Sequence, residues 1–234
     1  MTLINESRGP QSAAKIAGAA YLLTMIASVF NEFFARGSIA GHSDMATLAA
    51  QLAANEQLFR IGLASELFNA LGVTVLAVAL YVIVKPVNRH VALLALLWRV
   101  VEVAVLAIIP LTSFVVMKLL SGTGYLNVFE SEQLGALAKL FLDSHAYGAD
   151  IGLLFFSIGS ATFSYLFLKS RLIPKLLAGW GVFASLLVFV CTAAYFLAPD
   201  QTRFLFPACY LPIFIYEVTL GFWLLVKGIR TETV

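Results

Sequence analysis

Six long apolar segments, separated by short polar breaks, make up most of the chain. They cover about residues 14–34, 58–84, 91–120, 142–168, 174–198 and 204–226. Each reaches the roughly 20 residues that an α-helix needs to cross a bilayer. Proline and charge mark the breaks, as at Lys85–Pro86. The pattern therefore predicts an all-α polytopic membrane protein, with residues 1–234 as a single domain of six transmembrane helices in one bundle.

The composition agrees with a membrane environment. Of the 234 residues, 61% are hydrophobic and 12% are charged, whereas about 25% charged residues is usual in a soluble domain. The formal net charge of +2 is small and dispersed, which argues against a nucleic-acid partner. The two cysteines form no zinc or redox motif, so we expect no cofactor. The composition implies the lipid bilayer as a partner. It does not predict the oligomeric state.

The distribution of basic residues predicts how the spans are oriented. With the N-terminus inside, nine Lys and Arg residues lie in the cytoplasmic segments and four lie outside. The inner group is Arg8, Lys15, Lys85, Arg89, Lys169, Arg171, Lys175, Lys227 and Arg230, and the outer group is Arg36, Lys118, Lys139 and Arg203. By the positive-inside rule both termini are therefore cytoplasmic. No cleavage site follows the first apolar run, so we expect a retained span rather than a signal peptide.

Both long connections lie outside in this topology, and each contains a short helical pattern. One starts at an N-cap, Ser43–Asp44, and has apolar positions at Met45, Leu48 and Leu52. The other starts at Ser131 and has apolar positions at Leu134, Leu137 and Phe141. We expect two short helices that pack against the outer end of the bundle, and the alternative is a lid over an outward-facing cavity.

The fourth span combines a polar face with a glycine face. Its polar positions recur every seven residues and so form one stripe on a helix, at Asp143, Asp150, Ser157 and Ser164. On roughly the opposite side lie three glycines, Gly148, Gly152 and Gly159, with His145 near their edge. Such a helix is suited to line a polar interior with one face and to pack closely against a neighbour with the other.

Nine ionisable side chains fall inside the predicted spans or at their outer ends. They are Glu32, Arg60, Glu66, Arg99, Glu102, Asp143, His145, Asp150 and Glu217. An uncompensated charge at the centre of a membrane helix costs at least about 2.5–3.5 kcal/mol, so such residues usually have partners or a function. At about 1.5 Å per residue the set extends from the outer surface to the middle of the membrane. We therefore expect one polar region that narrows inward.

Some of these charges have a partner on their own helix. Glu32 and Arg36 are four residues apart, and Arg99 and Glu102 are three apart, so each pair can form within one helix.

Three acids, Glu66, Asp150 and Glu217, have no basic neighbour on their own helix. They must pair with Arg60 or Arg99 from another helix, bind a cation, hold a proton, or hydrogen-bond as neutral acids. The acids outnumber these two arginines, so pairing alone leaves some acids without a basic partner. The alternative is a satisfied polar network that only fixes the register of the helices.

A divalent metal is the alternative partner for the outer acids. Its candidate ligands are Asp143, His145 and Asp150, but Asp143 and His145 do not share a helix face and no HExxH-like spacing is present. We therefore expect no metal.

Two further features affect the packing of the spans. Pro110, Pro207 and Pro212 lie inside spans and are expected to bend them, with a hinge or a wider cavity as the alternative. Cys191 and Cys209 lie at similar depths in the last two spans, and we expect packed free thiols, with pairing left open.

Several segments resemble an integral-membrane family of bacteria known as domain of unknown function 4386. The matching pieces are KIAGAAYLLTMIASVFNEFFAR, LFRIGLASELFNALG, LYVIVKPVNRHVALLALLWRVVEV, LFLDSHAYGADIGLLFFS, IPKLLAGWGVFAS and EVTLGFWLLVKG, in the same order. Ala149 stands where the family pattern often has a tyrosine. The resemblance implies a six-span protein of the bacterial inner membrane and implies no activity.

The function we predict is a polar cavity that opens outward and binds or transports a small solute or cation. Its core acids are Glu66, Asp150 and Glu217, and the Arg99–Glu102 pair forms its inner limit. The enzyme alternative is an intramembrane metal-dependent hydrolase, acting on lipid or amide substrates, that uses Asp143, His145, Asp150 and Glu66. The third alternative is a non-catalytic membrane protein with a structural polar network.

Overall fold

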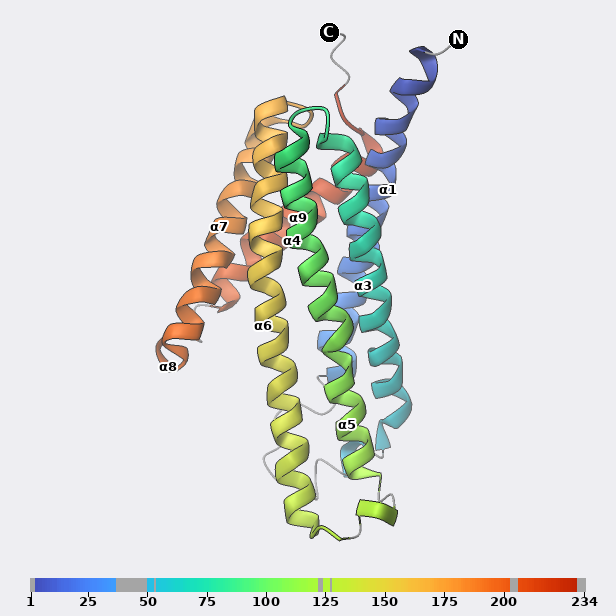
Figure 1. Ribbon diagram of the computed structural model, residues 1–234, viewed down its shortest axis with the longest axis vertical. Helices are drawn as coiled ribbons and strands as arrows, with labels where there is room; N and C mark the ends of the chain where they lie inside the picture. Colours follow the sequence, from blue (N-terminus) through green and yellow to red (C-terminus); the bar gives the residue numbers. More distant parts are fainter. Residues whose placement is uncertain are drawn as a thin grey trace. The chain divides into compact units, whose positions relative to one another are not determined.

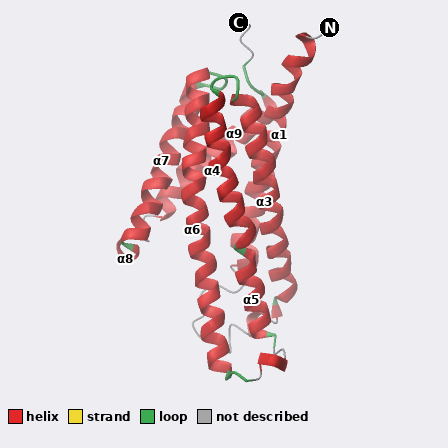
Figure 2. Ribbon diagram, viewed as in Figure 1, coloured by secondary structure: helices red, strands yellow, loops and turns green. Residues whose placement is uncertain are grey.

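The computed structural model describes residues 3–36, 50–52, 54–121, 124–126, 128–202 and 206–230. Every regular element in these ranges is a helix, and they contain no strand (Figure 2). Six helical segments within them are long and apolar enough to cross a membrane. This confirms the all-α prediction with six spans. The predicted helix after Ser43 falls mostly outside the described ranges.

The elements follow one another along the chain as coloured in Figure 1. In order they are α1 (Leu3–Phe30), the π-helix η1 (Asn31–Arg36), α3 (Glu56–Val84), α4 (Arg89–Ile108), α5 (Pro110–Leu120), the 3₁₀-helix η2 (Gly124–Leu126), α6 (Ser131–Ser170), α7 (Lys175–Leu197), α8 (Pro199–Thr202) and α9 (Phe206–Val226). Together α4 and α5 make up the third span.

Local sequence accounts for several helix ends. Pro86 stands two residues after Val84, the last residue of α3, where its ring cannot continue a helix. The side-chain oxygen of Asn88 then accepts from the backbone N–H groups of His90 and Val91, both at 3.1 Å, and so caps α4. At the far end of the chain Gly228 has φ +68°, the left-handed conformation that favours glycine just after a helix.

Pro110 divides the third span into two helices. Proline has no N–H to donate to the preceding turn, so the α-helical ladder is interrupted there. The backbone N–H of Thr112 instead reaches the carbonyl of Ile109 at 3.0 Å. The sequence predicted that Pro110 bends its span, and the structure has a break there between α4 and α5.

The fourth span is longer than predicted. A helix does start at Ser131, but it is not a separate surface helix: α6 runs without interruption from Ser131 to Ser170. The prediction of a separate short helix there was wrong, because residues 131–142 contain no proline and only an isolated glycine, Gly135, which a helix tolerates.

Contacts divide the chain into two compact units. Unit 1 comprises Met1–Met25, Leu71–Val103 and Ile151–Val234, and unit 2 comprises Ile26–Ala70 and Ala104–Asp150. Four helices, α1, α3, α4 and α6, contribute residues to both units. The single-domain organisation expected from the sequence stays a prediction.

Unit 1 has a hydrophobic core in which α1 and α9 approach each other closely. Fully buried residues of this core include Ala14 and Ala17 of α1 and Leu220 and Leu224 of α9. At Gly18 the backbones nearly touch: a Cβ placed there would lie 2.5 Å from the backbone nitrogen of Leu225. Small residues allow such an approach between membrane helices, which gains dispersion contacts that larger side chains would prevent.

One end of unit 1 brings together three segments that are far apart in sequence. The side-chain amide of Gln11 donates to the carbonyl of Ile229 at 2.6 Å and accepts from its N–H at 3.2 Å. The N–H of Arg230 donates to the carbonyl of Leu172, in the turn between α6 and α7, at 2.9 Å. Residues 11 and 229 therefore lie at the same end of unit 1. This agrees with an even number of spans, which puts the start of the first span and the end of the last span on the same side of the membrane.

Unit 1 also contains a disulfide between Cys191 of α7 and Cys209 of α9. The expectation of two free thiols was wrong. Both cysteines lie near the ends of antiparallel helices joined by a short connection, and this geometry brings their Cα atoms within 6.5 Å. The sequence shows that the two cysteines lie at similar depths in two spans. It does not show that their sulfur atoms are bonded.

Candidate functional site

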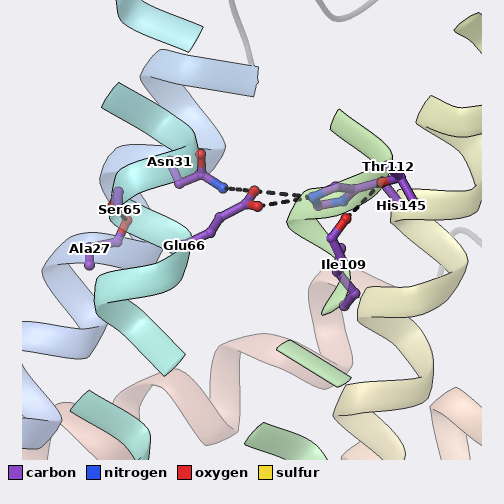
Figure 3. A network of polar contacts seen from close by, with 7 residues as sticks. All are labelled: Ala27, Asn31, Ser65, Glu66, Ile109, Thr112 and His145. Atoms are coloured by element: carbon purple, nitrogen blue, oxygen red, sulfur yellow. Dashed lines mark hydrogen bonds and ion pairs between the residues drawn. The ribbon is translucent and has the colours of Figure 1, made fainter. Parts of the chain in front are cut away.

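A carboxylate in α3 is held by side chains from two other elements of unit 2. Oε1 of Glu66 accepts a hydrogen bond of 2.7 Å from Asn31 Nδ2. Nε2 of His145 lies 3.1 Å from Oε1 and 3.2 Å from Oε2 of the same carboxylate (Figure 3). His145 is only 5% exposed, so the contact is shielded from solvent. An imidazole in this position can donate from Nε2 when neutral or form an ion pair when protonated.

The π-helix η1 positions the amide that reaches Glu66. It begins at Asn31, where α1 ends. Such wide turns are rare and often occur at functional sites. One turn earlier, the carbonyl of Ala27 accepts from Ser65 Oγ at 3.1 Å, which fixes the register of α3 against the end of α1 (Figure 3).

The break at Pro110 forms another part of this site. The carbonyl of Ile109 accepts from Thr112 Oγ1 at 2.8 Å, which satisfies the backbone at the break (Figure 3). Gly148 of α6 packs against the same residue, since a Cβ there would lie 2.9 Å from Ile109 Cγ1. This close approach brings His145, one turn earlier on α6, to the cavity.

A cavity of about 170 Å³ adjoins the Glu66–His145 pair. Its lining is Ala27, Ser28, Asn31, Glu32, Ser65, Glu66, Asn69, Leu106, Ile109, His145 and Ala149, all of unit 2. Pockets for drug-sized ligands have about 300–1,000 Å³, so this one suits several water molecules or a small solute.

The polar groups of this lining include two carboxylates, which accept hydrogen bonds and carry negative charge. Glu32 and Glu66 contribute these carboxylates, and among the described residues of the lining His145 is the one basic side chain. The buried Oδ1 of Asn69 has no hydrogen-bond partner among the described residues. The cavity therefore favours a ligand that carries N–H or O–H donors or a positive charge.

Several other predicted site residues lie elsewhere in unit 2. Asp143 is exposed, and Asp150 is half-buried next to Ala149, which lines the cavity. Arg60 pairs at 2.7 Å with Glu56 on its own helix, where both are more than half exposed, and among the described residues it has no ion pair with an acid of another helix. The side chain of Arg36, the predicted partner of Glu32, is outside the described part of the chain.

Three further predicted residues belong to unit 1. Arg99 NH1 lies 3.0 Å from Glu102 Oε2, which confirms the predicted pair at i, i+3. Glu217, on α9, is half-buried. The contacts given by the structure thus place Glu66 and His145 in one unit and Arg99, Glu102 and Glu217 in the other.

The polar stripe of α6 changes its surroundings along the helix. Asp143 is exposed, whereas Ser157 and Ser164 are buried. Ser157 Oγ donates to its own helix, and Ser164 Oγ hydrogen-bonds the Tyr216 hydroxyl at 2.8 Å. The serines therefore contribute to helix packing in unit 1 rather than to the cavity.

The metal set that the hydrolase alternative requires is not assembled. No group of three His, Cys, Asp or Glu side chains lies close enough to hold a metal ion in the described part of the chain. Asp143, His145, Asp150 and Glu66 are all within that part.

Asn31 is one of the site residues that sequence reasoning missed, together with Ser65 and Asn69. The sequence carried a signal, since Asn31 is a polar side chain next to Glu32 at the end of an apolar run. Its role depends on the π-helix, which no spacing rule anticipates.

Comparisons with known proteins identify the family of this chain. A family model described as domain of unknown function (DUF4386) matches residues 16–228. The chain belongs to this family. The matched range includes all six spans, in whole or in large part. It also includes all the described residues that line the cavity.

The DUF4386 chain is also similar to an archaeal protein. A protein of Archaeoglobus fulgidus described as "Uncharacterized protein" is 23% identical over 186 residues, which cover 76% of this chain and 94% of that protein. No solved structure matches the chain.

Proposed function

We propose that this protein binds, and carries across the membrane, a small cation or protonated solute in the cavity beside Glu66 and His145. The observation that supports this most is the paired carboxylate and imidazole at a small polar cavity among membrane-spanning helices. Ionisable residues inside membrane spans commonly mark the paths of ions and protons. Both groups of the pair can exchange a proton, so binding would depend on pH.

The charge and size of the cavity support a cation. Two carboxylates and one imidazole line the cavity, so a positive ligand is attracted and an anion is repelled. Ammonium-type ligands also bring N–H donors to the buried Oδ1 of Asn69.

The location we propose is the bacterial inner membrane, with both termini in the cytoplasm and the cavity opening outward. The basic residues Lys175 and Lys227 support this, because they lie at the ends of α7 and α9 opposite the disulfide. Disulfides form in oxidising compartments such as the periplasm, so Cys191 and Cys209 agree with outer helix ends.

Glu66→Gln is the variant that tests the proposal, because glutamine keeps the shape of the side chain and removes its charge. Thermal unfolding of purified protein in lipid nanodiscs is measured as methylammonium, ammonium, sodium or potassium chloride replaces choline chloride at constant ionic strength. In the unaltered protein we expect saturable stabilisation by at least one of these ions, about 1.4 kcal/mol at ten times its Kd. In Glu66→Gln we expect the response to fall at least tenfold.

Asp143→Asn is the matched control, because Asp143 is an exposed acid two residues from His145 on the same helix. It should respond as the unaltered protein does. A purely structural network is the competing function, supported by the hydrogen bonds that already satisfy Glu66. No response to any of the four ions, or an equal response in Glu66→Gln, would favour that network and reject a cation site.

A further inference from the structure

A second cavity lies in unit 2, between the first turns of α3 and the last turns of α5. Its volume is about 490 Å³, within the range of about 300–1,000 Å³ that is usual for small-molecule sites. Its lining is Leu52, Glu56, Arg60, Phe114, Met117, Lys118, Leu120 and Ser121, all of unit 2. The described residues of this lining and those around Glu66 and His145 have no member in common, so this cavity is distinct from the first.

The topology of unit 2 places this cavity beside the lipid headgroups. The second span starts at Glu56 and the third ends at Leu120. Successive spans cross the membrane in opposite directions, so these two ends lie at the same membrane surface. Arg60 is four residues after Glu56, and Phe114 is six residues before Leu120, which puts them about 6 Å and about 9 Å along their helices. The lining therefore extends from the headgroup layer to the edge of the hydrocarbon core.

One part of the lining is an apolar wall that belongs to the packed interior. Leu52 is only 5% exposed and lies in a buried cluster with Val116. Met117 and Leu120 pack against the same cluster, so the wall is built into the fold. Phe114 adds an aromatic ring that is exposed. Such a wall favours the hydrocarbon part of a ligand over water.

The rest of the lining carries a positive net charge. Arg60 and Lys118 contribute two positive charges and Glu56 contributes one negative charge. Nε and Nη2 of Arg60 donate to Glu56 Oε1 at 2.8 and 2.7 Å. An exposed pair of this kind stabilises only weakly, and a guanidinium has five N–H groups, so Arg60 can also bind a phosphate. Lys118 is exposed in the last turn of α5.

We propose that this cavity binds an anionic phospholipid. Its phosphate lies beside Arg60 and Lys118, and its glycerol and first acyl carbons lie against the apolar wall. A phosphodiester carries one negative charge, which offsets the formal net charge of +1 in the lining. Inorganic phosphate has no carbon atoms to cover the wall. A zwitterionic phospholipid adds an ammonium group, which the two basic side chains repel.

Native mass spectrometry of the full chain in a neutral detergent tests this proposal. Phosphatidylglycerol and phosphatidylcholine with identical acyl chains are titrated separately. In the unaltered protein we expect a Kd for phosphatidylglycerol at least tenfold below that for phosphatidylcholine. Arg60→Gln and Lys118→Gln should each raise the Kd for phosphatidylglycerol at least fivefold. Glu56→Gln should lower it, because this variant removes the negative charge that competes with the phosphate.

Lys139→Gln is the matched control, because Lys139 is an exposed lysine of unit 2 that is not among the described residues of this lining. It should bind phosphatidylglycerol as the unaltered protein does. Thermal unfolding in the same detergent shows whether each variant is folded, and two charge-removing variants are used so that a folding failure in one does not decide the result.

Three results would overturn the proposal. Equal Kd values for the two lipids in the unaltered protein would show that the cavity does not select an anionic lipid. An equal loss in Lys139→Gln, or weaker binding in Glu56→Gln, would show general attraction to a basic surface instead of a site. If glycerol 3-phosphate displaces the lipid as effectively as the lipid binds, the site takes a free phosphate compound and the lipid assignment fails.

Discussion

Replacing Gly18 with alanine is expected to reduce the stability of unit 1. The new Cβ would lie 2.5 Å from the backbone nitrogen of Leu225 and 2.7 Å from the backbone oxygen of Gly221. Backbone atoms cannot rotate away as a side chain can, so α1 and α9 must separate. Overpacking of this kind typically costs about 1–3 kcal/mol. Thermal unfolding in a fixed detergent measures the loss.

Gly179→Ala is the matched control within the same unit. A Cβ at Gly179 meets nothing within 4 Å. Because alanine is favoured over glycine in a helix by about 0.5–1 kcal/mol, this variant should be neutral or more stable. If Gly18→Ala unfolds at the same temperature as Gly179→Ala, the close approach of α1 and α9 is not present in solution.

Reduction of the disulfide is expected to have the second large effect. Cys191 and Cys209 enclose a loop with a sequence separation of 18. The chain-entropy relation gives about 3 kcal/mol for a loop of this length, and helices that stay inserted after unfolding would make the effect smaller. A reductant should therefore lower the unfolding temperature.

The double variant Cys191→Ser, Cys209→Ser provides the comparison for this effect. It should unfold at the temperature of the reduced protein and should not respond to reductant. Alkylation with a mass-tagged maleimide, before and after reduction, counts the free thiols directly. Two tags without reductant would show that the thiols are free after all.

The spans could be predicted from sequence because a bilayer imposes a length and a composition on each of them. The predicted start of the second at residue 58 and end at 84 lie close to Glu56–Val84 as observed. The continuous helix from Ser131 was missed because its first turns extend beyond the apolar run and so carry no membrane signal. The disulfide was missed because the sequence gives the depth of two residues but not the rotation of their helices.

For the site, the sequence supplied the charged residues but not their grouping. Ionisable side chains in apolar runs are conspicuous, so Glu66 and His145 were both selected. Their pairing depends on the π-helix at Asn31 and on the close packing of Gly148 against Ile109, which are tertiary features. Arg99 and Glu102 were paired correctly because their contact is local to one helix turn.

The contact of α1 with α9 also sets an order for biosynthesis. Gly18 leaves the ribosome 207 residues before Leu225, its partner. At about 5–20 residues per second, the first span waits roughly 10–40 s in the membrane before the last one is made. During that time its alanine and glycine face has only lipid, translocon or other spans to cover it. Unit 1 is therefore completed only when the final helix docks, and the Gln11–Ile229 hydrogen bonds form at the end of that process.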